Sequence, residues 1–320
     1  MADRTADRQG TPVPAMTPVV TGTETPPTVE ALGLEEHGLS QRTLMWRRFR
    51  RHKLAMASLI VLVLIGLATI LAGVLTPYGY AEQQLDQILQ GPSAKHWLGT
   101  DQLGRDELTR LLYGGRISLM VGVGVALVSG VIGTVVGAAA GFYGGRLDNA
   151  VMRVTDLFLS IPLLVLLIIA SRATGGKTRD IVLVLSLALW MFMARIVRGL
   201  FLSLREKEFI EAARSIGASN RRIILRHMLP NSIGVIIVNL TLTVAIAILT
   251  ESLLSFLGFG VQPPTPTWGN MLEDGRPQMT FAGWLVWFPG LAILLTVLCV
   301  NFLGDGLRDA LDPTQRRVRA

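Results

Sequence analysis

Residues 117–142 read ISLMVGVGVALVSGVIGTVVGAAAGF, a run of 26 residues without a charged side chain. An α-helix rises about 1.5 Å per residue, so about 20 apolar residues cross the roughly 30 Å of bilayer hydrocarbon. The run therefore predicts a membrane-spanning helix. Three other uncharged segments are long enough for the same interpretation: 54–75, 232–250 and 281–304.

Two shorter segments, 157–170 and 181–194, have only 14 uncharged residues each. They can cross a bilayer only if each helix extends through its flanking charges. Pro162 should kink the first of them because proline lacks a backbone N–H. We expect an all-α polytopic membrane protein with six transmembrane helices at about 54–75, 117–142, 151–171, 181–200, 232–257 and 281–304. The alternative has four spans, with the two short segments forming a re-entrant pair.

The composition supports a membrane protein. Only 17% of the 320 residues are charged and 50% are hydrophobic, whereas soluble proteins average about 25% charged residues. A single cysteine, Cys299, excludes an intrachain disulfide framework and a thiolate metal cluster. The four histidines are scattered, so we expect neither a metal nor a cofactor on this chain.

The basic residues predict the orientation. With six spans, 22 of the 30 lysines and arginines fall on the side of both termini and eight on the other side. Cytoplasmic loops carry this excess, so both termini should be cytoplasmic in a multi-pass prokaryotic cell membrane. The net charge of +7 is spread over the loops of one membrane face, which argues against a nucleic-acid partner.

The chain ends should differ from the span region. Residues 1–40 are rich in proline and threonine and predict a disordered cytoplasmic tail. No apolar run precedes Leu54, so the first span should act as a signal anchor. Residues 41–53 mix Trp46 and Phe49 with basic residues, which suits an interfacial helix, although a solvated leader fits as well. Residues 314–320 form a basic C-terminal tail.

Gly133, Gly137 and Gly141 recur every four residues within the second span and share one helix face. Such a face favours close helix packing, although it is also compatible with the lining of a passage. The sequence GGKT at 175–178 is like the end of a phosphate-binding loop. That motif requires a glycine at the position of Ser171 and a preceding strand, and both are missing, so we do not expect such a loop.

The longest internal loop, 205–231, reads REKEFIEAARSIGASNRRIILRHMLPN. Residues 206–216 predict a short helix with Phe209, Ala213 and Ile216 on one face. Gly217 should supply a turn, Ser219 should cap a second helix, and Pro230 should end that helix. Such a compact projection suits the docking of a partner, and an ordinary amphipathic connector is the alternative.

The loop also resembles a family. The EAA loop of membrane subunits in binding-protein-dependent ABC importers is matched by Glu211, Ala212, Ala213, Gly217, Leu229 and Pro230. His227 stands where isoleucine is usual, but 226–231 is similar to the peptide-transporter branch. The segment LGTDQLGRDELTRLLYGGRISL at 98–119 resembles the C-type dipeptide and oligopeptide permease subunit, with Thr109 in place of the usual serine. The resemblance runs from about 42 to 313.

The resemblance implies a MetI-like permease, with the permease domain at 54–313, that pairs with a second, B-type permease subunit. It also implies two cytoplasmic ATPase subunits, which hold ATP and Mg, and an extracytoplasmic substrate-binding protein. A coupling helix around 218–224 would enter one ATPase, and Ala218, Arg214, Arg221 and Arg222 would lie in that contact. This chain would have no catalytic residue. Its substrates would be peptides, or else nickel chelates or other small solutes.

The roles of two polar residues within the apolar segments remain open. Glu251 is either a gate or pathway residue or a hydrogen-bonded contact to a neighbouring loop or to the other permease. Asn301 is either a helix contact or a pathway residue. A self-contained secondary transporter is the other functional class. It would need coupling-ion residues near the membrane middle and usually an internal repeat, neither of which the sequence shows.

Overall fold

The computed structural model describes residues 41–311. The chain divides into two units, 1–44 and 45–320, and the second, as far as residue 311, is described below. The tails expected at 1–40 and 314–320 lie outside the described residues. Within those residues there is no β-strand, only an isolated bridge between Thr100 and Asp106. The predicted all-α class is confirmed.

The described residues form long helices joined by short ones. The helices are, in chain order, α1 Gln41–Arg51, α2 Lys53–Ile70, α3 Ala72–Leu75, α4 Glu107–Tyr143, α5 Gly145–Ser160, α6 Leu163–Thr174, α7 Thr178–Arg205, α8 Glu208–Ser215, α9 Asn220–Arg222, α10 Leu229–Phe256, α11 Trp268–Gly275 and α12 Trp284–Leu311. A π-helical segment, Ile223–Met228, joins α9 to α10. Short 3-10 turns lie at Leu85–Gln87 and Arg276–Gln278.

Five helical rods have the length and composition of membrane spans: α2, α4, α7, α12 and the rod Asn220–Phe256, which contains α10. The pair α5–α6 meets the same test together but bends by 89° at its break. Pro162 lies in that break, where the sequence predicts a kink. α7 is one continuous helix, which contradicts the pairing of 157–170 and 181–194 as a re-entrant loop.

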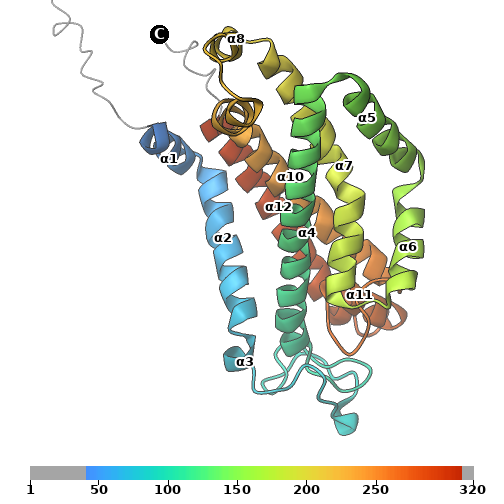
Figure 1. Cartoon of the computed structure of the whole chain (residues 1–320). Helices are drawn as coiled ribbons and strands as arrows, with labels where there is room; N and C mark the ends of the chain where they lie inside the picture. Colours follow the sequence, from blue (N-terminus) through green and yellow to red (C-terminus); the bar gives the residue numbers. More distant parts are fainter. Residues whose placement is uncertain (1–40, 312–320) are drawn as a thin grey trace, which may run out of the picture. The chain divides into compact units, whose positions relative to one another are not determined.

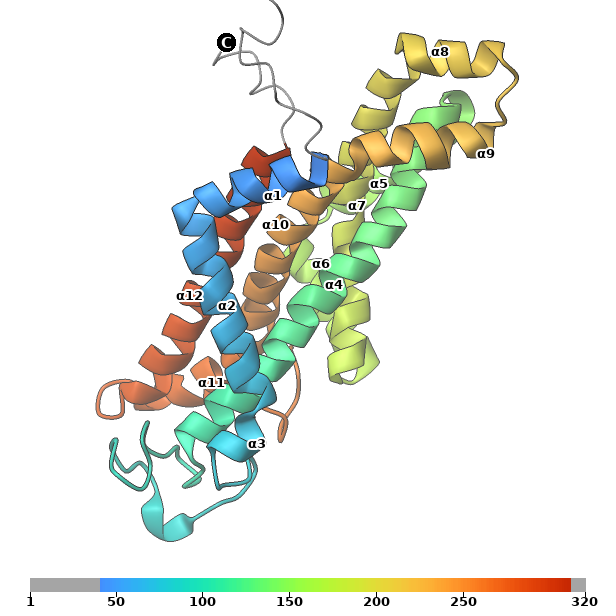
Figure 2. The ribbon, with the colours of Figure 1, turned by 90° about the vertical axis from the view of Figure 1, so that its left-hand side faces the viewer.

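α4 lies at the centre of the bundle and packs closely against α7 (Figures 1 and 2). Gly133, Gly137 and Gly141 face α7, and a Cβ on Gly137 would lie 2.4 Å from the carbonyl oxygen of Ala194. On α10, Leu240 and Ile248 lie against two other glycines of α4, Gly130 and Gly122. Side chains at these glycines would separate the helices, so glycine permits the backbones to approach.

The bundle has two ends, named here the α8 end and the α11 end after the helices that lie there (Figures 1 and 2). The start of α2 and the end of α12 meet at the α8 end, where Phe49, Ala55 and Ala310 form a buried cluster. At the α11 end, the Ser171 hydroxyl near the end of α6 donates to the carbonyl of Phe259. Both chain ends of the bundle therefore lie at the α8 end, and the bent pair α5–α6 runs from the α8 end to the α11 end. Of the helices that the structure describes, five can cross a membrane by length and composition, or six if this bent pair is one span.

The close contact between α4 and α7 can be tested with Gly137→Val. Because the new side chain would overlap the backbone at Ala194, we expect the purified protein in detergent to lose about 1–3 kcal/mol of stability. The measurement is the midpoint of thermal unfolding. Gly66 on α2 has nothing within 4 Å of its added Cβ, so Gly66→Val is the matched control. Equal midpoints for the two variants would contradict the close contact.

Candidate functional site

The loop between α7 and α10 forms a helical hairpin at the α8 end. α8 ends at Ser215, and Gly217 follows with φ +77°, a left-handed conformation that glycine adopts readily. The N–H of Ala218 donates to the carbonyl of Ala213 at 3.0 Å, which closes the turn. The Ser219 hydroxyl accepts from the N–H of Arg222 at 3.4 Å and caps α9. The turn and the cap lie where the sequence predicts them.

One face of α8 is buried. Ile210 and Ala213 are buried in a cluster with Phe201 of α7. Phe209 is 43% exposed and Ile216 is 85% exposed. Both sets of residues have helical spacing, so the pattern alone does not select between them. Of the three residues predicted to share a face, Phe209, Ala213 and Ile216, only Ala213 is buried.

The prediction that Pro230 ends the second short helix is wrong. Pro230 is the second residue of α10, and the helix runs on without interruption from Asn220 to Phe256. A proline ring usually clashes with the carbonyl four residues earlier, here that of Arg226. The π-helical turn widens the helix at this point, and the N–H of Leu229 donates to Ile224, five residues back.

The hairpin presents a mixed outer surface above an apolar base. Ile223 and Met228 are fully buried in the cluster that holds Ile210. Leu229 packs against that cluster and Ala218 joins it from the turn, whereas His227 is half-buried outside it. The exposed residues of the hairpin include Glu211, Ala212, Arg214, Arg221, Arg222 and Pro230. The hairpin is thus fixed at its base and open to a partner on its outside.

Two contacts join the hairpin region to the end of α4. The Arg214 guanidinium lies 5.9 Å from the ring centroid of Phe142, a cation–π distance. Arg205, the last residue of α7, donates from NH1 to the carbonyl of Phe142 at 3.4 Å. Since the same hairpin continues into α10, it is connected to α4, α7 and α10 together.

Glu251 lies at the other end of α10 and has no exposed surface. Its carboxylate accepts from the Ser255 hydroxyl at 2.7 Å and from the Ser118 hydroxyl of α4 at 3.3 Å. The Ser118 oxygen accepts in turn from the N–H of Trp268, the first residue of α11, at 3.2 Å. These hydrogen bonds link α10, α4 and α11, which is the arrangement that the contact interpretation of Glu251 describes.

Asn301 is half-buried on α12. Its side-chain amide donates to the carbonyl of Val297 in its own helix at 2.9 Å. Asn301 therefore bonds to the backbone of its own helix, and its side chain makes no hydrogen bond with Glu251.

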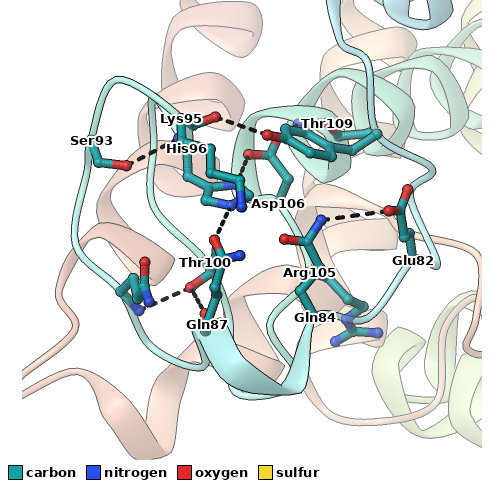
Figure 3. A network of polar contacts seen from close by, with 12 residues as sticks. Glu82, Gln84, Gln87, Ser93, Lys95, His96, Thr100, Arg105, Asp106 and Thr109 are labelled. Carbon is teal, nitrogen blue, oxygen red and sulfur yellow. Dashed lines mark hydrogen bonds and ion pairs between the residues drawn. The ribbon is translucent and has the colours of Figure 1, made fainter.

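A second polar network at the α11 end holds the segment before α4 (Figure 3). His96 is buried between Asp106 and Gln87, with its ring nitrogens 2.8 Å from each side-chain oxygen. Asp106 caps α4 by accepting from the N–H of Thr109 at 2.8 Å. Asp106 and Thr109 of this network belong to the segment 98–119 that resembles the C-type permease subunits, and His96 and Gln87 precede it.

Charged residues join this segment to α11. Arg105 and Arg110 donate to Asp274 at 3.1 and 2.9 Å, and Arg105 also pairs with Asp101 at 2.5 Å. Sequence reasoning missed these contacts, because Asp274 lies 164 residues from Arg110. Both arginines are buried, and buried arginines usually have an acidic partner. The need for such a partner was the signal that could have indicated these contacts.

Across residues 41–311, no group of three or more His, Cys, Asp or Glu side chains is arranged to hold a metal ion.

Comparisons with known proteins give two family matches. Residues 133–317 match the model described as binding-protein-dependent transport system inner membrane component. Residues 40–92 match the N-terminal TM domain of oligopeptide transport permease C.

Curated relatives match most of the chain. The oligopeptide transport system permease protein OppC of Mycobacterium bovis is 45% identical, over 88% of this chain and 97% of the relative. The dipeptide transport system permease protein DppC of Bacillus subtilis is 43% identical over 90% of both. OppC of Escherichia coli K12 is 45% identical over 88% and 94%.

The role of Glu251 as a buried hydrogen-bond acceptor can be tested by thermal unfolding. Glu251→Leu leaves the Ser118 and Ser255 hydroxyls without their acceptor, so we expect a loss of about 1–3 kcal/mol for each unsatisfied group. Glu251→Gln retains an acceptor oxygen and should stay close to the parent protein. The hydroxyl of Thr250 bonds to the carbonyl of Ile246 in its own helix, so Thr250→Val is the control. A Glu251→Leu protein as stable as the parent would contradict this role.

Proposed function

Because this chain belongs to the family of binding-protein-dependent transport system inner membrane components, we propose that it forms, with a second permease subunit, the alternating-access pathway of a peptide importer. The family places it among the permease subunits of ABC importers in bacterial membranes. The printed names of its relatives refer to oligopeptide and dipeptide transport. Peptides are therefore the proposed substrates.

The hairpin at the α8 end is the observation that carries the coupling proposal. Its tip residue, Ile216, is 85% exposed beside the turn at Gly217. The base is held by the buried side chains of Ile210 and Ile223. A large exposed apolar side chain flanked by arginines and fixed on a packed base suits a protein cleft, because apolar contact supplies affinity and charge supplies orientation.

The proposed partner at this hairpin is one of two cytoplasmic ATPase subunits. When ATP binds to the ATPases, their closure would move the hairpin, and α4, α7 and α10 would follow through the contacts described above. To shift a two-state permease from 1:99 to 99:1, the partner must bind one state more tightly by about 5.5 kcal/mol. A hairpin joined to three helices can transmit such a difference without slipping.

The remaining assignments follow from this orientation. The α8 end would face the cytoplasm, where most of the basic residues lie, and the α11 end would face the substrate-binding protein. ATP and Mg would be held by the ATPases, and this chain would contribute no catalytic residue. The network around His96 and the pairs to Asp274 would keep the α11 end rigid for that contact.

Gly217→Pro tests the turn of the hairpin. Proline requires φ near −65°, whereas Gly217 has φ +77°, so the turn cannot form. We expect the complex to assemble in the membrane but ATP hydrolysis to be uncoupled from peptide uptake. Both rates are measured in proteoliposomes with the partner subunits. Uptake at the parent rate would refute the coupling role of the turn.

Ile216→Asp tests the docking contact without disturbing the packed base. Because Ile216 is 85% exposed, the substitution should leave the thermal midpoint unchanged. A buried charge in the docked complex should weaken the contact by several kcal/mol, so ATPase subunits should be lost during purification. Ile88→Asp makes the same change at a residue that is 44% exposed at the α11 end and should retain them. Retention by Ile216→Asp would contradict docking at this residue.

A further inference from the structure

An exposed ion pair joins α5 to α7. Arg195 of α7 donates to Asp156 of α5, and the two side chains are 45% and 63% exposed. A second pair, between Arg198 and Asp148, lies closer to the α8 end and is more buried. The Arg195–Asp156 pair is unusual because it is open to its surroundings on a helix that has the composition of a membrane span.

With Asp180 at one membrane surface, the position of Arg195 along α7 would place it inside the hydrocarbon. Fifteen residues, or about 22 Å of helix, separate Asp180 from Arg195, which is less than the roughly 30 Å of hydrocarbon. Arg205 lies a further 15 Å or so along the same helix. An exposed ion pair at this depth would be costly against lipid. Arginine alone can extend toward the surface, but the short side chain of Asp156 holds it in place.

The neighbouring helix α10 carries three half-buried polar residues on one face. Asn239, Thr243 and Thr250 lie within about 40° of one another around the helix. Their side chains donate to carbonyls of their own helix at 2.7–2.8 Å. Ile248 points the other way, into α4, and Leu240 lies to one side of this face, against Gly130 of α4. Lipid would favour a uniformly apolar face here.

α7 connects the ion pair to this polar face. Its Arg195 reaches α5, and its Met193 and Val197 belong to the buried cluster that includes Leu240 of α10. At 100° per residue, the arc of α7 between these contacts carries Phe192, which is 49% exposed, Ile196, which is 36% exposed, and Gly199, which has open space around it. The ion pair and the polar face therefore border one continuous surface.

We propose that this surface of α5, α7 and α10 lines the water-filled half of the translocation pathway on the α8 side, with the Arg195–Asp156 pair in its wall. The proposal rests on the proposed function and adds to it which helices the substrate passes. The contrasting surface is α2, whose exposed side chains are apolar: Ile60, Val63, Leu64 and Leu67. That side faces lipid. Water at the ion pair removes the cost that lipid would impose and leaves both charges accessible to a peptide with charged ends.

Cysteine accessibility in the assembled importer tests the proposal. The background is Cys299→Ala, which removes the buried native thiol. Asp156→Cys, Asn239→Cys and Phe192→Cys place probes on the three helices of the surface. Leu64→Cys on α2 and Val131→Cys on α4, at residues 60% and 65% exposed, are the matched controls. A negatively charged, membrane-impermeant methanethiosulfonate is added to vesicles from the α8 side.

We expect the three probes to react at least about tenfold faster than the two controls, because a charged reagent enters water but not hydrocarbon. Reaction at the control rate would overturn the proposal, whether lipid or the second permease covers the surface. Should Asp156→Cys not assemble, Asn239→Cys and Phe192→Cys decide the result. ATP-dependent peptide uptake by the Cys299→Ala parent is measured in parallel, so failure of the proposed function is distinguished from failure of this inference.

Discussion

The close approach of α4 to α7 is the contact on which the rest of the bundle depends. In a bilayer, apolar side chains gain little by leaving lipid for one another, so helices associate through dense packing. Glycine at 133, 137 and 141 brings the α4 backbone next to the carbonyl oxygens of Trp190, Ala194 and Arg198. α10 then packs on another side of α4, at Gly122 and Gly130. The two ends of α4 serve different contacts, with the hairpin at Phe142 and α11 at Ser118.

Local rules predicted those parts of the fold that are decided locally. The cost of placing charge in hydrocarbon is a property of each segment, so uncharged runs located the apolar parts of α2, α4, α10 and α12. The helices extend beyond these runs where charged residues flank them, since α4 begins at Glu107 and α12 ends at Leu311. Pro162 located the break between α5 and α6 because the loss of one N–H acts at one position. The size of the bend, 89°, depends on what the two helices pack against, and the sequence carried no such information.

The wrong and the missing predictions arose where distant contacts decide the outcome. Phe209 and Ile210 both begin a helical stripe through Ala213, so the spacing left the buried face of α8 undecided, and the position of Phe201 selects Ile210. Pro230 is a helix breaker by rule, but a π-helical turn accommodates it. In the candidate site, the turn at Gly217 and the cap at Ser219 were predictable from residue type. The hydrogen bond from Ser118 to Glu251 spans 133 residues and was not.

The uninterrupted helix from Asn220 to Phe256 has a mechanical consequence. Its 37 residues make a lever about 55 Å long, with the arginines of the hairpin at one tip and Glu251 near the other. A rigid lever transmits rotation as well as displacement, so twisting the hairpin about its axis would turn Glu251 against its hydroxyl donors. The angular register between the two tips is set by the residue count, since one residue more or fewer rotates one tip by about 100°. The number of residues in this segment therefore fixes how the hairpin and Glu251 are oriented relative to each other.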